Sequence, residues 1–102
     1  MAFSRSSTVV GTSATDLLAT VSGETVVIGL VVANVSSSTD NITVLINNGS
    51  DNFHLIKSAP VPVGSTLSVL DGKVVLGSGD SVKVHAGASA TALEATISVL
   101  TL

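Results

Sequence analysis

The amino-acid sequence predicts an all-β fold: a small antiparallel β-sandwich of about eight short strands, connected as a jelly roll or as an immunoglobulin-like domain. Three observations lead to this prediction. Clusters of Gly, Ser, Asn and Asp divide the 102 residues into short segments, at roughly the 8 to 12 residue spacing typical of sandwiches and barrels. The segments are rich in Val, Ile and Thr, whose branched side chains fit a pleated surface. Several of them alternate apolar and polar residues, as half-buried strands do.

The predicted strands lie between the turn clusters. In chain order they are Thr15–Val21, Glu24–Val35, Asn41–Asn47, Phe53–Ala59, Thr66–Leu70, Lys73–Leu76, Ser81–Ala86 and Leu93–Thr101. Asn48-Gly49 is a strong hairpin signal between the third strand and the fourth, and Asp71-Gly72 is a turn signal between the fifth and the sixth. A helix over Ala88–Ala95 is the alternative near the C-terminus, because Ala and Leu favour helices.

Alternation predicts which side chains face the core. It is clearest in the third strand and in the last one, where the period of two puts one set of residues inside and the other towards solvent. The expected inward residues of these two strands are Ile42, Val44, Ile46, Leu93, Ala95, Ile97 and Val99.

The strand Glu24–Val35 is apolar on both of its faces. This pattern is typical of a central strand that is covered on both sides, here by the second sheet and by something else. Gly29 in its middle predicts a bulge or a close approach of another backbone. We expect Val27, Leu30 and Val32 to take part in docking on a partner.

Residues 1–14 are expected to form a flexible N-terminal arm, and residues 15–102 the β-sandwich domain. The Ser, Thr and Gly residues of the arm surround one apolar pair, Val9-Val10, and such a segment cannot bury enough apolar surface to order itself. It is either a frayed terminus or a docking segment that lies along a neighbouring molecule, with Val9 and Val10 as its anchor.

Composition and charge exclude several classes of function. Only 11% of the residues are charged, against roughly 25% in a typical domain. The four Lys and Arg residues are scattered and the net charge is −3, which argues against nucleic-acid binding, since that needs clustered cations. The longest apolar run, 26–33, is far shorter than the roughly 20 residues that span a membrane, so no membrane partner is expected.

The residues offer no constellation for catalysis, and we expect neither an enzyme nor a metal or cofactor site. The chain has no Cys, which excludes thiolate chemistry and a zinc-thiolate site. Its two His, His54 and His85, lie within predicted strands and are expected on polar faces. They could form a metal pair only if their strands were adjacent on one face, and no third ligand is evident.

Five segments together resemble the small β-sandwich structural proteins of tailed bacteriophage virions, over about residues 16–102. The resemblance is a pattern of turns and strands. It is carried by Val31–Ser36, Ser58–Leu67, Gly72–Leu76, Gly79–Val84 and Ala95–Leu100. This family includes capsid decoration (cement) proteins and components of tails and fibres, and it supplies no catalytic residues to carry over.

The resemblance implies a capsid decoration protein that stabilises the phage head by binding subunits of the major capsid protein. Low charge and many apolar residues favour a homo-oligomer, since an obligate interface resembles a domain core cut in half. The local three-fold points of a capsid imply a trimer on the exterior of the virion, from a chain that is soluble in the host cytoplasm before assembly. The alternative is a fibre module that binds a receptor or glycan, although glycan sites usually offer an aromatic platform and only 2% of the residues are aromatic.

Overall fold

The structure, a computed structural model, describes residues 2–70 and 72–102, and these residues form nine strands and no helix. The strands are β1 (Ala2–Val10), β2 (Thr15–Leu18), β3 (Thr25–Asn34), β4 (Asp40–Asn47), β5 (Asn52–Val61), β6 (Thr66–Ser68), β7 (Val74–Leu76), β8 (Ser81–Ala86) and β9 (Leu93–Thr101). The all-β prediction is confirmed, and all eight predicted strands are present. The alternative helix over Ala88–Ala95 is wrong, because 87–92 form a bent connection into β9. Asp71 of the predicted Asp71-Gly72 turn lies outside the described residues.

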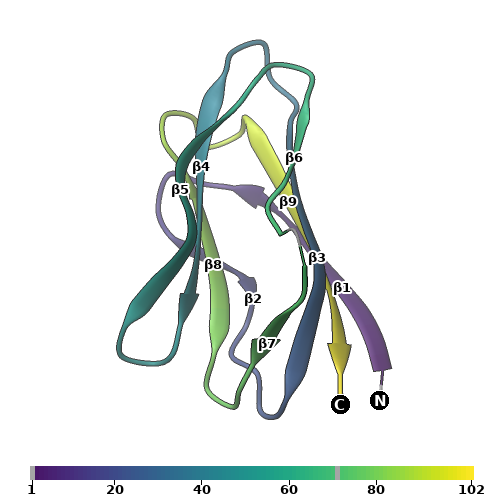
Figure 1. Ribbon diagram of the computed structural model, residues 1–102. Helices are drawn as coiled ribbons and strands as arrows, with labels where there is room; N and C mark the ends of the chain where they lie inside the picture. Colours follow the sequence, from purple (N-terminus) through teal and green to yellow (C-terminus); the bar gives the residue numbers. More distant parts are fainter. Residues whose placement is uncertain (1, 71) are drawn as a thin grey trace.

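The strands form two antiparallel sheets that face each other (Figure 1). Sheet A has the order β1-β9-β3, followed by β6 and β7, and sheet B has the order β2-β8-β4-β5. β6 pairs with residues 31–33 of β3 and β7 with residues 25–27, so these two short strands together form one interrupted edge. The chain crosses repeatedly between the sheets, and its first and last strands are neighbours. This is the connectivity of a jelly roll, the first of the two expected alternatives.

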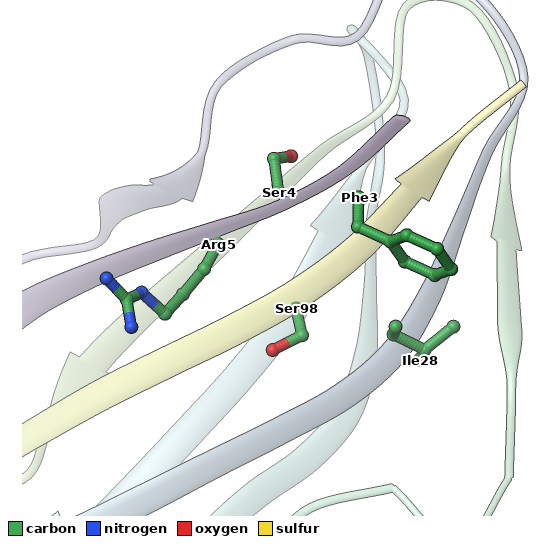
Figure 2. A pocket seen from close by; sticks show the side chains of 5 residues that line it. All are labelled: Phe3, Ser4, Arg5, Ile28 and Ser98. Atoms are coloured by element: carbon green, nitrogen blue, oxygen red, sulfur yellow. The ribbon is translucent and has the colours of Figure 1, made fainter. Parts of the chain in front are cut away.

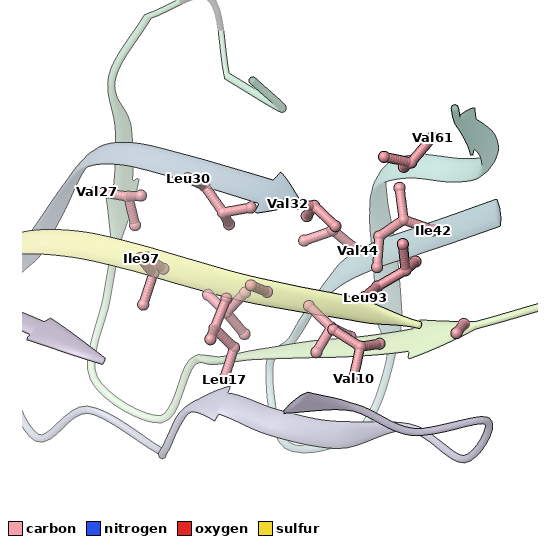
Figure 3. Close-up of a cluster of buried hydrophobic side chains, with 14 of the residues drawn as sticks. Val10, Leu17, Val27, Leu30, Val32, Ile42, Val44, Val61, Leu93 and Ile97 are labelled. Atoms are coloured by element: carbon pink, nitrogen blue, oxygen red, sulfur yellow. The ribbon is translucent and has the colours of Figure 1, made fainter. Parts of the chain in front are cut away.

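The core fills the space between the two sheets (Figure 3). The inward residues predicted from alternation in the last strand are all buried, and so are Ile42 and Val44 of β4. Ile46 is partly buried against the same core. In β9 these side chains alternate with outward ones, so that every second residue contributes to the core between the sheets.

A bulge at Gly29 decides which residues of β3 face inward. The register with β9 passes from Val27 opposite Val99 directly to Gly29 opposite Ser98, so that Ile28 is the extra residue. The bulge predicted from Gly29 is therefore confirmed. It shifts the alternation by one residue. The inward residue before the bulge is therefore the odd-numbered Val27, and those after it are the even-numbered Leu30 and Val32.

The N-terminal segment is where the structure differs most from the expectation. Residues 2–10 form β1, which pairs with β9 without interruption from Ala2 to Val10. Val10 is fully buried in the core, whereas its neighbour Val9 is exposed. Ordering comes from backbone pairing with β9 and from one inward Val, neither of which composition reveals. The division into an arm (1–14) and a domain (15–102) stays a prediction.

Two buried polar side chains hold the loops at the end of the sandwich where β3 leaves sheet A. The Nδ2 of Asn34 donates to the carbonyl oxygens of Ser38 at 2.9 Å and of Val61 at 2.8 Å, and its Oδ1 accepts from the backbone N–H of Ser36. All of its polar groups are thus satisfied, as burial requires.

Asp40, at the start of β4, holds the connection between β8 and β9. Its Oδ1 accepts from the backbone N–H groups of Asn41 at 2.8 Å and Ala88 at 2.9 Å, and its Oδ2 from that of Ser89 at 2.9 Å. Burial alone raises the pKa of Asp40, but these donors outweigh it and hold the pKa below its ordinary value of 3.8. The ionised carboxylate therefore stabilises the fold above pH 3.8, and this stabilisation is lost as the pH falls through the lower folded-state pKa.

Candidate functional site

The two His residues lie on neighbouring parts of sheet B, on the strands β5 and β8. His54 lies opposite Leu45 on one side of β4, and His85 lies opposite Thr43 on the other. With one strand between them and strands about 4.8 Å apart, the two imidazoles are not neighbours and cannot share a metal at about 2 Å. In the described part of the chain, no three His, Cys, Asp or Glu side chains gather as metal ligands do.

The outer face of sheet B carries a surface ion pair between neighbouring strands. The Nζ of Lys83 lies 2.8 Å from the Oδ1 of Asp16, which is its register partner on β2. Both side chains are partly exposed, so the pair adds little stability. This part of sheet B is therefore an ordinary solvent-exposed polar surface.

The five residues expected to dock on a partner lie mostly inside the protein. Val10, Val27, Leu30 and Val32 are buried between the sheets, at 0 to 1% exposure. These four side chains contact the core and are not available to a partner while the domain is folded. Val9 is 52% exposed on sheet A, and its docking role stays a prediction. Only the outward residues of the same strands are accessible from outside the folded domain.

The outer face of sheet A carries a row of apolar side chains that crosses four strands. Phe3 of β1 lies opposite Leu100 of β9, Leu100 opposite Val26 of β3, and Val26 opposite Val75 of β7. The two ends of this apolar row are the most exposed, with Phe3 at 75% and Val75 at 67%. Cross-strand neighbours on one face touch one another, so the row is a continuous apolar band.

The bulge enlarges this apolar surface beside the row. It turns Ile28 outward, where the side chain is 40% exposed. Figure 2 shows the ring of Phe3 lying over β9 on the side of Ile28, while Ser4 points to the opposite side of β1. Phe3, Ser4, Arg5, Ile28 and Ser98 line a shallow, open hollow at this place. Val31, further along β3, is also 40% exposed on the same face.

Both faces of the sandwich carry few charged strand residues. Among the outward strand positions of sheet A only Arg5 and Glu94 are charged, and one row across sheet B contains the ion pair Asp16 and Lys83 together with His54. Exposed apolar patches rimmed by polar residues mark interaction sites. The two aromatic residues lie on different sheets, Phe3 on β1 and Phe53 on β5, so they do not form a joint aromatic platform.

Fold and surface together define a jelly-roll β-sandwich with a row of apolar side chains across the outer face of sheet A. In the described residues, no helix is long and apolar enough to cross a membrane. Comparison of the sequence with known protein families gives no match, and no curated protein matches it.

Among solved structures, the chain is similar to a pentameric capsid protein isolated from metagenomic phage sequences. The TM-score is 0.51 and the sequence identity 17%. The match covers 93% of this chain and 59% of the capsid protein, so the chain spans less than two thirds of that protein's length. At this identity the likeness concerns the fold.

Proposed function

We propose that this chain is a structural protein of a phage particle that decorates the head by binding the major capsid protein through the outer face of sheet A. The observation that carries the proposal is the apolar row from Phe3 to Val75, on a face with only two charged strand residues. The similarity of the fold to a phage capsid protein supports the same role. The role is structural, with no catalytic residue and no cofactor, and its place is the exterior of the virion.

The size of this face suits a specific interface. The flat area of this face is roughly 600 Å² before the relief of the side chains is counted. It follows from a strand of nine residues at about 3.3 Å each and from four strand positions about 4.8 Å apart. A standard interface buries about 800 Å² on each partner. One side of sheet A is therefore of the right order to seat the protein on a capsid subunit without help from sheet B.

We also propose that the protein is a homo-oligomer on the shell. A capsid protein with the same fold is pentameric, and closed symmetry is the usual arrangement of homo-oligomers. The three copies expected from the local three-fold points of a capsid stay a prediction, which sedimentation of the purified protein tests directly.

The binding surface is tested by replacing both ends of the apolar row, in the variant Phe3→Ser/Val75→Ser. Binding to purified heads that lack the protein is measured by co-sedimentation. Loss of two apolar side chains at about 1.5 kcal/mol or more each corresponds to roughly a hundredfold rise in Kd. The matched control is Phe53→Ser, because Phe53 is 58% exposed but lies on sheet B. Equal affinity of the double variant and the control would show that sheet A is not the docking face.

A further inference from the structure

A sandwich of two sheets has four edges, and three of them carry features that prevent pairing with another strand. β2 has four residues, an irregular register and a charge at Asp16. β5 contains Lys57 and Pro60, and its register with β4 shifts twice. The remaining edge of sheet A is divided into β6 and β7, with three residues each. Short strands, bulges, charges and Pro are the ordinary means by which proteins protect an edge.

The fourth edge, β1, carries almost none of this protection. Its nine residues pair with β9 in one unbroken register from Ala2 to Val10. The strand contains no Pro and no Gly, and its one charged residue is Arg5. Within the described part of the chain, residues 2–10 make backbone hydrogen bonds with β9 alone. Every second residue therefore turns an N–H and a C=O towards open space, and β1 is ready to accept another strand.

We propose that β1 pairs with the β1 of a second copy, antiparallel about a two-fold axis at Ser6. A copy offers no other unprotected edge, so pairing between copies through their edges has to be of β1 with β1. Antiparallel pairing of identical strands is isologous, and it closes after two copies instead of growing into a fibre. This inference concerns the edge of sheet A and does not rest on the proposed docking of its face.

The sequence of β1 suits this register. With Ser6 on the axis, Phe3 lies opposite Val9 of the second copy on the outer face, which is a favourable aromatic and β-branched pair. Both side chains are exposed in the single chain, Phe3 at 75% and Val9 at 52%. Arg5 lies opposite Ser7, so that no like charges are directly opposed. On the inner face Ser4 lies opposite Thr8 and the two Ser6 residues face each other, while Ala2 lies opposite Val10, which is buried in its own core.

Such a pair joins the two copies of sheet A into one continuous sheet. The apolar row of each copy then ends against Val9 of the other copy, whose neighbour on β9 is Glu94. The two docking faces lie side by side and double the surface offered to a shell. This pairing gives an even number of copies, so that sedimentation decides between it and the three copies expected from the local three-fold points of a capsid.

A single cysteine tests the register, because the chain has no Cys of its own. In the proposed pair the two Ser6 residues face each other with Cα atoms about 5 Å apart, which is within the range of a disulfide. We expect Ser6→Cys to form a disulfide-linked dimer under mild oxidation. The matched control is Thr8→Cys, on the same face of β1, whose two copies would lie about four residues apart along the strands. Cross-linking of Thr8→Cys as fast as Ser6→Cys would overturn the register.

Charge at position 7 tests the pair in solution, since Ser7 is exposed and faces Arg5 of the second copy. Sedimentation of the wild type at high micromolar concentration should give twice the chain mass of 10.1 kDa. In the Ser7→Lys variant, each introduced lysine faces Arg5 of the other copy, and the repulsion should raise the dimer Kd at least tenfold. In the Ser7→Glu variant, each introduced glutamate gives Arg5 an acidic partner, and the dimer Kd should fall. Thermal midpoints establish that both variants are folded. A monomeric or trimeric wild type, or equal Kd values for the two variants, would overturn the proposal.

Discussion

Replacing Val10 by Ala should destabilise the domain strongly, although composition assigns this residue to a flexible arm. Val10 is 0% exposed and belongs to the core. The two methyl groups that are removed are worth roughly 0.8 kcal/mol each, and the remaining cavity adds about 1 kcal/mol. We expect a loss of about 2 to 3 kcal/mol in the free energy of unfolding. With an unfolding entropy of about 2.1 cal/mol/K per residue over 102 residues, Tm falls by about 10 to 14 °C.

The control for this experiment is the neighbouring residue, in the variant Val9→Ala. Val9 has the same side chain and lies on the same strand, but it is 52% exposed on the outer face, so its loss should change stability by no more than about 0.5 kcal/mol. Thermal unfolding of both variants is followed by circular dichroism at low micromolar concentration. If Tm of Val10→Ala lies within about 2 °C of the control, residues 1–14 are a separate arm and β1 is not part of the folding unit.

Two further predictions concern the loops. Asp40→Asn should cost about 1.5 to 3 kcal/mol at pH 7, because it removes the charge that three backbone N–H groups share. The difference from the wild type should shrink as the pH falls from 3.8 through the lower folded-state pKa of Asp40, because the unfolded chain takes up a proton first and the folded carboxylate only below that pKa. Urea unfolding between pH 7 and 2.5 measures this, and a difference that is constant with pH would contradict it. Gly79→Ala should cost about 1 to 2 kcal/mol, because Gly79 has a φ of 95° with open space around it. Gly77→Ala in the same turn is the control. An equal Tm of the two variants would show that the loss of stability in Gly79→Ala does not come from backbone strain.

The strands could be predicted because their signals are local. Branched residues, turn residues and a period of two are all properties of short segments, as in β9, where Leu93, Ala95, Ile97 and Val99 turn inward as expected. The sheet order is a different matter, since it joins segments that are distant in the sequence. The pairing of Ala2 with Thr101 leaves no local trace, and the sequence therefore left two connectivities open.

β1 was missed for a related reason. Its inward positions are Ala2, Ser4, Ser6, Thr8 and Val10. Two apolar side chains in five, one of them only Ala, are too few for a recognisable strand pattern, and a composition rich in Ser and Thr is typical of a disordered tail. What orders the segment is its backbone pairing with β9, to which the side chains contribute little. Composition therefore underestimates the order of an edge strand that has a long neighbour.

The sequence located the apolar surface on the correct strand but on the wrong side of it. In an ordinary strand the polar residues mark the outer face, but β3 has apolar residues at nearly every position and so provides no such mark. The bulge at Gly29 then reverses the alternation halfway along the strand. Val26 and Val27 are neighbours with the same side chain, yet only the register, which sets Val26 between Leu100 and Val75, turns Val26 to the surface. Because the apolar row joins residues 3, 26, 75 and 100, it exists only in the folded sheet.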